Sequence, residues 1–409
     1  MANVSSSNGI EKRPKLRFES HSDASHSYWE SHTLADYLSP RVEKQVPTEE
    51  APLMAFTAEG GVEPKGDRYD RSYLVKSDNK LYKRTELGDF IYSSNNLDVG
   101  SMGLNKYGTA VISDVYEIFS IKDTAAPSFI DELIHCPNVL HKILQYRQGC
   151  LYGQYRIYAD DFLSVSVLAP SKAEQQRISD FFATLDKKIM FQRKLIEYLK
   201  KYKRGVVKTL LDPKQNKRQN VIWKSDTIGN LGTFIKGAAL SKADISDSGT
   251  PFILYGELYT TYKEVVRTIV RTTQANVDGV YLSKVGDVVI PTSGETPEEI
   301  STASCIMVPD VILAGDLNIY RSTIVDGRII SYLLNHIVNE QIARVAQGKS
   351  VVHVQASEIG KISITYPDHD EQARIAEILE LIDNRIAHSE ASLSSMQEMK
   401  KALLQQLFI

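Results

Sequence analysis

The stretch Pro170–Ile189 reads PSKAEQQRISDFFATLDKKI and opens a helical pattern that continues to Leu211. Ser171 and Glu174 have the S-x-x-E spacing of a capping box, which marks the start of a helix. Apolar residues then recur in alternating steps of four and three, the heptad seam of a coiled coil. The seam consists of Ile178, Phe182, Leu185, Ile189, Ile196, Leu199, Val206 and Leu210. At 1.5 Å per residue, a helix of roughly 36 residues is about 54 Å long, more than one compact domain needs.

The same stretch occurs again at the C-terminus with a constant offset, so that Pro170 corresponds to Pro367 and Ile178 to Ile375. The second seam consists of Ile375, Leu379, Ile382, Ile386, Leu393, Met396, Leu403 and Leu407. Each seam is interrupted twice by a polar residue, and the interruptions correspond: Gln192 to Ser389, and Lys203 to Lys400. Asp368 and Glu371 repeat the capping box. Two unrelated amphipathic helices would not share these interruptions, so we interpret the chain as a tandem repeat.

Composition describes an ordinary globular protein of 409 residues with a net charge of −3. No apolar run approaches the roughly 18 residues of a membrane span, and the N-terminus has no hydrophobic signal region. The three cysteines, Cys136, Cys150 and Cys305, are odd in number and widely spaced, which suits a reducing compartment and favours neither disulfides nor zinc. We therefore expect a cytoplasmic protein.

Charge is distributed unevenly between the two helical stretches. Ser171–Leu211 contains 11 Lys and Arg against 4 Asp and Glu, whereas Asp368–Phe408 contains 4 against 8. These charges either form two solvated faces or help the helices to pair with each other.

The remaining chain divides around the two helices. The openings WESHTLAD at Trp29 and WKSDTIGN at Trp223 match, and each begins a region of short β-type runs. In the first region these runs are Tyr73–Lys76, Leu81–Arg84, Asp89–Tyr92, Tyr155–Tyr158 and Leu163–Val167. Each region also carries a helical pattern that ends before a glycine, at Ser128–Gln148 (interrupted by Pro137) and at Arg328–Gln347.

These patterns predict an α+β protein with two mixed α/β domains. Two long antiparallel coiled-coil helices separate the domains in a pseudo-two-fold tandem repeat. The predicted segments are a mobile tail at 1–27, a first domain at 28–169, a helix at 170–212, a second domain at 213–366 and a second helix at 367–409. The residues expected to pair the helices and bind partners are Ile178, Phe182, Leu185, Ile189, Leu199, Ile375, Leu379, Ile382, Ile386 and Met396.

Motifs for catalysis are missing from the sequence. It has no phosphate-binding loop, no G-x-G-x-x-G, and no H-E-x-x-H, C-x-x-C or EF-hand spacing. It also lacks the [DNS]-P-P-[YFW] stretch of an amino-methyltransferase, and no (D/E)-x-K follows Pro309–Asp310 at nuclease spacing. We expect no catalytic residue, no metal site and no cofactor in this chain.

Polar and aromatic side chains near turns are the remaining candidates. Lys and Arg can neutralise phosphates, and Ser, Thr, Glu and Arg can read base edges in a major groove. In the first domain the candidates for DNA binding are Lys83, Arg84, Lys106 and Tyr107. In the second domain they are Lys236, Gly237, Lys242, Tyr255, Glu257, Lys263, Ser293, Glu295, Thr296, Arg321, Lys349, Ser350 and His353.

These features together resemble the specificity subunits of type I restriction-modification systems. The resemblance covers nearly the whole chain after the tail. It rests chiefly on Pro170–Ile189, on its copy with EQARIAEIL at Glu371–Leu379, on the two Trp openings, on FIKG at Phe234–Gly237 and on GDVVIP at Gly286–Pro291.

The resemblance implies two target-recognition domains, each reading one half of a split, asymmetric sequence in double-stranded DNA. It implies that the long helices separate the domains and hold two modification subunits, which carry S-adenosylmethionine and flip the target adenine. Restriction subunits would add ATP- and Mg-dependent translocation and cleavage. Two alternatives stay open: a coiled-coil scaffold that joins two protein-binding domains without touching DNA, and a subunit that serves a methyltransferase alone.

Overall fold

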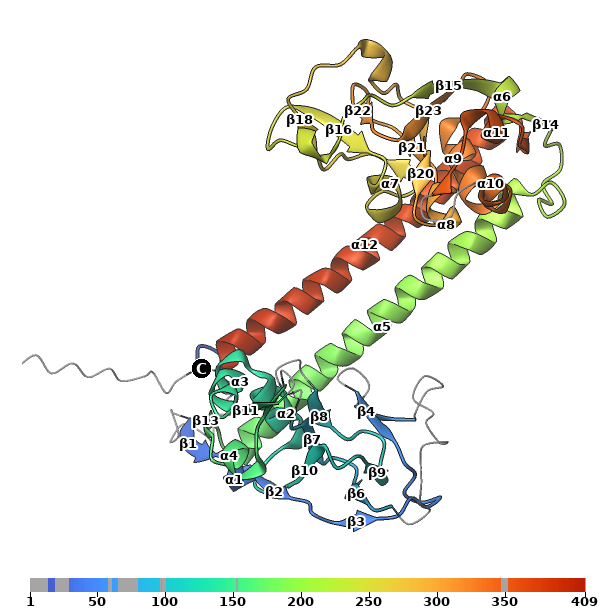
Figure 1. Ribbon diagram of the computed structural model, residues 1–409. Helices are drawn as coiled ribbons and strands as arrows, with labels where there is room; N and C mark the ends of the chain where they lie inside the picture. The colour runs from blue at the N-terminus through green and yellow to red at the C-terminus, as the bar shows by residue number, and fades with distance from the viewer. Residues whose placement is uncertain are drawn as a thin grey trace, which may run out of the picture. The chain divides into compact units, whose positions relative to one another are not determined.

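The computed structural model describes residues 14–18, 29–57, 61–64, 80–95, 97, 101–151, 154–346 and 352–408. The chain forms two compact units: unit 1 contains residues 1–191 and 393–409, and unit 2 contains residues 192–392. The two long helices, α5 (Lys172–Leu211) and α12 (His369–Leu407), each contribute one half to each unit (Figure 1). The predicted strand at Tyr73–Lys76 lies outside the described residues.

Unit 1 is built on a four-stranded antiparallel sheet with the order β2 (Leu38–Pro40), β10 (Tyr116–Ile121), β7 (Phe90–Ser93) and β8 (Met102–Leu104). Its other elements are α1 (Leu34–Tyr37), β3 (Lys44–Gln45), β4 (Ala55–Thr57), β5 (Gly61–Glu63), β6 (Tyr82–Thr85), β9 (Ala110–Ile112), β11 (Gln148–Leu151), β12 (Gln154–Arg156) and α4 (Ala159–Leu163). Because α4 ends at Leu163, the strand predicted there begins only at Ser166.

Unit 2 contains a corresponding sheet with one additional strand at its edge. Its order is β15 (Gly232–Lys236), β23 (Leu317–Ser322), β19 (Asp287–Pro291), β21 (Ser304–Ile306) and β17 (Val265–Val266). β17 runs parallel to β21, which makes this sheet mixed. The other elements are α6 (Ile228–Leu231), two short 3-10 helices (Lys242–Asp244 and Gly279–Tyr281), β16 (Thr250–Leu254), α7 (Glu257–Thr260), β18 (Thr272–Thr273), β20 (Ser293–Gly294), α8 (Pro297–Ile300), β22 (Ile312–Ala314), β24 (Val352–His353) and α11 (Ala356–Gly360).

The opening of each domain pairs with the strand that precedes its long helix. β1 (Glu30–Thr33) pairs antiparallel with β13 (Ser166–Ala169), and β14 (Trp223–Thr227) pairs in the same way with β25 (Ser363–Pro367). Trp29 is fully buried in a cluster with the rings of Phe129 and Phe408, whereas Trp223 is only half-buried. The predicted correspondence of the two openings is therefore confirmed, although only the first tryptophan is a core residue.

Each predicted domain helix is a pair of shorter helices. Unit 1 contains α2 (Pro127–His135) and α3 (Pro137–Leu144), because Pro137 fits the first turn of a new helix but not the interior of a continuous one. Unit 2 contains α9 (Gly327–His336) and α10 (Asn339–Val345).

A repeated glutamine joins each domain to its long helix. Gln175 accepts a hydrogen bond from the backbone N–H of Ala126 at the start of α2, and Gln372 accepts one from Asp326 at the start of α9. Both glutamines are buried, and each satisfies a backbone N–H at a helix start that has no partner within the helix.

The predicted seam is confirmed over most of its length. In unit 1, Ile178, Phe182, Leu185 and Ile189 are buried in one cluster with Leu407 and the half-buried Leu393 and Met396. In unit 2, Ile375 and Leu379 are fully buried and Ile382 is packed beside them. Ile386 is buried as well, and Leu199 is half-buried.

The end of the α5 seam differs from the prediction by one residue. Val207 and Leu211 are the buried positions, while Val206 and Leu210 are only partly covered. This last part of α5 packs against the core of the second domain as well as against α12, so the buried face turns away from the heptad pattern.

The predicted capping boxes form only in part. Ser171 and Asp368 do accept hydrogen bonds from the backbone N–H groups of Glu174 and Glu371. The reciprocal hydrogen bonds, from the backbone N–H of each cap residue to the glutamate side chain, do not form. Each glutamate carboxylate is buried and binds arginine instead. Arg17 binds Glu174 through two hydrogen bonds of 2.9 Å, and Arg218 and Arg374 bind Glu371.

Arg17 belongs to a segment, Pro14–Phe18, that was predicted to lie in a mobile tail. The backbone N–H groups of Lys15 and Leu16 donate to the carbonyl of Gln406 near the end of α12. The Phe18 carbonyl accepts a hydrogen bond from Arg177, and its ring lies 5.1 Å from that of Phe181. This segment is therefore part of unit 1, held by polar groups of both long helices.

A matched pair of leucines on α12 tests the seam. Leu379 is fully buried in unit 2, and Leu381 is 70% exposed two residues later. We expect Leu379→Asp to cost at least the roughly 2–5 kcal/mol of a large-to-small core substitution, because it also buries a charge. Leu381→Asp should stay within about 0.5 kcal/mol of the parent. Thermal unfolding followed by circular dichroism measures both, and equal melting temperatures would show that the seam is misassigned.

Candidate nucleic-acid interface

A hollow of about 750 Å³, lined by both polar and apolar side chains, lies on unit 2 where three chain segments meet. The end of β15, the turn that leads into β23 and the segment after β24 form its walls. β24 is held beside β20 by the pairing of Ser293 with His353. The hollow thereby collects Lys236, Gly237 and His353, three of the predicted DNA-binding residues that lie far apart in the sequence. We call this hollow the β15–β24 groove.

Asp316 organises the turn beneath the groove. Its carboxylate accepts a hydrogen bond of 3.1 Å from the Ser293 hydroxyl, and its backbone carbonyl accepts the N–H of Thr292. Ser293 is buried by these contacts, while Asp316, Lys236 and His353 are exposed. The groove thus offers a cation, a carboxylate and an imidazole within one concave surface.

Asn318 is the buried polar group of this surface. It lies on β23 and lines the groove, yet only 2% of the residue is exposed. Its Nδ2 has no hydrogen-bond partner within the described part of the chain. Because an unsatisfied buried donor costs about 1–3 kcal/mol, this N–H group would be stabilised by donating a hydrogen bond to water or to a bound ligand.

Gly237 allows the groove to form. A Cβ at this position would lie 2.8 Å from the Gly315 carbonyl oxygen and 3.0 Å from Cδ1 of Leu317. Any larger residue would have to push apart the strand end and the turn that line the groove.

Two predicted residues continue from the groove along the chain. Glu295 and Thr296 are exposed at the start of α8, where the Thr296 hydroxyl caps the helix by accepting the N–H of Glu299. The backbone N–H of Glu295 donates to the same glutamate's carboxylate. These contacts fix the backbone and leave the Glu295 side chain on the surface.

Other predicted residues do not line the groove. Lys242 and Lys263 are exposed and Tyr255 is half-buried. Lys349 and Ser350 lie outside the described residues.

Glu257 and Arg321 are used inside the fold. Glu257 is buried, accepts the backbone N–H of Leu254 and pairs with Arg271. Arg321 binds the buried carboxylate of Asp287 at 3.0 Å and donates to the carbonyl of Leu282. In unit 1, Arg41 binds Asp89 at the corresponding glycine-aspartate turn. These are contacts that hold turns in place, so we leave Glu257 and Arg321 out of the proposed reading surface.

The four candidates of unit 1 fall on two sides of β6. Lys83 is tied to Glu117 at 2.8 Å, whereas Arg84, on the opposite face, pairs with Glu86. Glu86 also accepts a hydrogen bond from Thr109. Through this contact Arg84 lies near the turn that carries exposed Lys106 and Tyr107. The structure therefore groups Arg84, Lys106 and Tyr107 more closely than Lys83.

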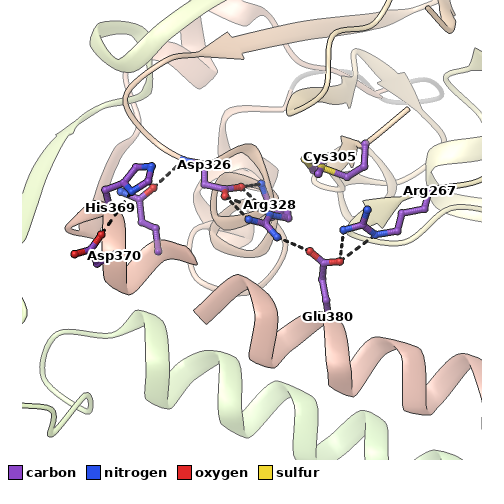
Figure 2. Close-up of polar contacts among 9 residues, drawn as sticks. Arg267, Cys305, Asp326, Arg328, His369, Asp370 and Glu380 are labelled. Carbon is purple, nitrogen blue, oxygen red and sulfur yellow. Dashed lines mark hydrogen bonds and ion pairs between the residues drawn. The ribbon is translucent and has the colours of Figure 1, made fainter. Parts of the chain in front are cut away.

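The domain of unit 2 is anchored to α12 by a network of charges. Figure 2 shows Glu380 between Arg328 at the start of α9 and Arg267. Burial raises the pKa of the Glu380 carboxyl, but hydrogen bonds from the two arginines outweigh burial and lower it. Arg328 also binds Asp326, so one guanidinium links the cap of α9 to the long helix.

Among the described residues, no group of three or more His, Cys, Asp or Glu side chains is arranged to hold a metal ion. Within the same part of the chain, no helix combines the length and apolar character that crossing a membrane requires.

Sequence reasoning missed Asn318, Asp316 and Gln355, which also line the groove. A signal for Asn318 was present, since it is a polar residue inside the apolar strand LNIY at Leu317–Tyr320. Asp316 and Gln355 had no such signal, because their place depends on how β20 and β24 pair.

Arg321 offers a test of its structural role. Removing one partner of a buried ion pair costs about 3–5 kcal/mol, so Arg321→Met should lower the melting temperature of the protein strongly by leaving Asp287 unpaired. Lys242→Met, at an exposed position, should change stability by no more than about 0.5 kcal/mol. If calorimetry finds Arg321→Met as stable as the parent, the arginine is free to serve another function.

Comparison with known proteins agrees with this architecture. Residues 220–395 match the family described as "Type I restriction modification DNA specificity domain". A search of curated proteins finds no match. Among solved structures, the chain is similar to the S subunit of a type I restriction-modification system from M. genitalium, with a TM-score of 0.60 and 15% identity over 97% of this chain and 99% of that one. It is also similar to a chain from a study of complex assembly and conformational transition of the type I R-M system, with a TM-score of 0.53 and 14% identity over 93% of this chain and 97% of that one.

At these identities the solved structures establish the fold, and the family match supplies the class of domain. The repeated helices, the paired strands at each domain opening and the matched residues 220–395 agree with one another. Residues 220–395 therefore match the type I restriction modification DNA specificity domain, and the whole chain has the fold of the solved S subunit from M. genitalium.

Proposed function

We propose that each domain of this specificity subunit reads one half of a bipartite, asymmetric DNA site. The observation that carries the proposal is the β15–β24 groove, which brings Lys236, His353 and Asn318 together on a domain of the specificity family. Lysine can neutralise a phosphate, and asparagine amides can pair with the edge of adenine. The turn with Arg84, Lys106 and Tyr107 is the corresponding candidate surface in unit 1.

We propose further that the long helices set the spacing of the two half-sites and bind two methyltransferase subunits. The seam is buried in both units, while Phe191, Tyr198 and Tyr202 are exposed on α5. Exposed aromatic side chains are typical of protein interfaces. The partners would carry S-adenosylmethionine, and restriction subunits would use ATP and Mg.

The role proposed for this chain is recognition without catalysis in the cytoplasm. The chain lacks the sequence motifs of methyltransferases and of phosphate-binding ATPases. In such a complex the specificity subunit selects the DNA, and its partners flip and modify the base.

A scaffold that joins two protein-binding domains would keep the same helices without binding DNA. The two functions are separated by mixing the purified chain with its methyltransferase and a labelled duplex that carries the methylated site. We expect binding that depends on sequence and falls steeply with salt. Equal retention of all duplexes, or none, would favour the scaffold.

Division of labour between the domains gives a prediction. His353→Ala and Gln355→Ala should relax the choice of bases in one half-site, with about 1–3 kcal/mol lost for each base contact. Lys106→Ala and Tyr107→Ala should affect only the other half-site or weaken all sequences alike. Lys361→Ala, exposed on unit 2 outside the groove, is the control. Binding to duplexes with single base changes measures this, and equal loss on both half-sites from every variant would contradict two independent readers.

The spacing role gives a second prediction. Inserting four residues after Gln192 and four after Ser389 lengthens both helices by about 6 Å and roughly one turn, so the seam is nearly kept. DNA rises about 3.4 Å per base pair, and the preferred spacer should therefore grow by one or two base pairs.

Sequencing of methylated adenines gives the spacer directly. The half-site bases should not change, because the reading surfaces are untouched. An unchanged spacer in an active variant would show that the helices do not set the distance.

A further inference from the structure

The two lysines that interrupt the seams are not solvated gaps. Lys203 is 7% exposed, and its Nζ lies 2.5 Å from Oδ1 of Asp383 on α12 and 2.7 Å from Oε2 of Glu264. Lys400 of unit 1 has its Nζ 2.9 Å from Asp186 on α5 and 2.9 Å from Glu132. Each lysine thus joins the partner helix to the domain packed against it.

The two contacts are copies of one contact. Lys203 and Lys400 are separated by the same number of residues as Asp186 and Asp383, which is the offset of the tandem repeat. The pair Lys203–Asp383 in unit 2 therefore corresponds to the pair Lys400–Asp186 in unit 1. Each lysine also lies near an aromatic ring, although the two rings do not correspond in the repeat: Lys203 lies 5.2 Å from the Tyr332 ring on α9, and Lys400 lies 6.0 Å from the Phe182 ring on α5.

The other pair of interruptions behaves in the same way. Gln192 donates a hydrogen bond of 2.9 Å to the Ser389 carbonyl, and these two residues correspond to each other in the repeat. Every polar interruption of one seam therefore has a polar partner on the other helix.

The two carboxylates that bind Lys203 are each held in place by a further contact. The Tyr332 hydroxyl donates to Asp383 at 2.6 Å, and Nε2 of His336 lies 2.5 Å from Glu264. Burial raises the pKa of the Glu264 carboxyl, but the hydrogen bond with His336 and the charge of Lys203 outweigh burial and lower it to about 2. A shift of α12 along α5 would separate Lys203 from Asp383 and leave buried charges without partners, which proteins avoid strongly.

We propose that Lys203 and Lys400 are specificity-determining residues that fix the register of α5 against α12, and thereby the single spacer length that the subunit accepts. A leucine seam alone tolerates sliding, because every turn offers a similar apolar surface. Single buried polar residues at seam positions are known to specify register at a cost in stability. The inference rests on the proposed reading of a bipartite site.

The test replaces the charges without leaving any carboxylate unpaired. The neutral-pin variant combines Lys203→Met, Glu264→Gln and Asp383→Asn with Lys400→Met, Glu132→Gln and Asp186→Asn. The matched control is Lys200→Met with Glu390→Gln, an exposed ion pair between the same two helices. Each full-length chain is produced with its methyltransferase in a host without other adenine methylation, and modified sites are mapped by sequencing.

We expect the neutral-pin variant to fold and to methylate the parent half-sites with a mixture of spacers. A slip of one helical turn, about 5.4 Å, corresponds to one or two base pairs. The control and a Lys203→Arg/Lys400→Arg variant, which keeps the pairs, should retain the single parent spacer.

The remaining outcomes decide against the inference. A neutral-pin variant that is active with one unchanged spacer would overturn the register role, and so would one that fails to fold, because the lysines would then serve folding itself. If the parent protein yields no bipartite methylated site, the proposed function fails first and the inference with it. Mixed spacers in the control would also contradict it, since any loss of charge would then suffice.

Discussion

The burial of both long helices in two separate cores is the constraint on which the rest of the structure depends. α5 starts in the core of unit 1, where Ile178 is fully buried, and ends in the core of unit 2, where Val207 is fully buried. α12 runs the other way, with Ile375 in unit 2 and Leu407 in unit 1. Neither helix would be very stable as an isolated polar spacer in water, because most of the stability of a helix in a protein comes from packing its apolar face. Each domain therefore stabilises half of both helices, and the helices in turn complete both cores.

The opposite charges of the two helices favour one alignment of the helices but contribute little to the stability of their packing. Lys200 and Glu390 form an exposed ion pair, and such pairs contribute about 0–1 kcal/mol. Lys203 is different, because its burial requires a charged partner and Asp383 supplies one in this register; Lys400 is partly buried and its partner Asp186 is half-exposed. The opposite charges of the two helices thus form two kinds of ion pair. The exposed pair contributes little to stability, whereas the buried pair requires one particular register of the helices.

The helices and the correspondence of the two domain openings could be predicted from the sequence because periodicity and repetition record them. Ile178, Leu185 and Leu379 are in the core as the heptad pattern predicts. The shift to Val207 at the end of α5 could not be predicted, because a second surface, the domain core, competes with the partner helix there. The docking of Pro14–Phe18 was also missed, since it depends on the buried carboxylate of Glu174 finding Arg17 from far away in the chain.

The candidate site was predictable only in part, for a related reason. Lys236 and His353 stand out as polar residues near turns, and the structure brings them together. Arg321 and Glu257 stand out in the same way, but their charges are used within the fold. A sequence shows that a polar side chain is present, but it does not show whether that side chain forms an ion pair or hydrogen bond with a buried partner. Asn318 is the opposite case, a polar residue in an apolar strand whose amide has found no partner among the described residues.

The contrast between repeated and divergent parts has a physical origin. Positions shared by the two halves include the buried Gln175 and Gln372. Each accepts a hydrogen bond from a backbone N–H group that needs an acceptor in either domain. The groove of unit 2 and the Tyr107 turn of unit 1 are surface features, and no packing requirement makes them alike. A duplicated frame with free surfaces can present two different recognition sites while keeping one set of helix contacts. The proposed reading of an asymmetric, two-part sequence requires this property, and a single symmetric dimer could not supply it.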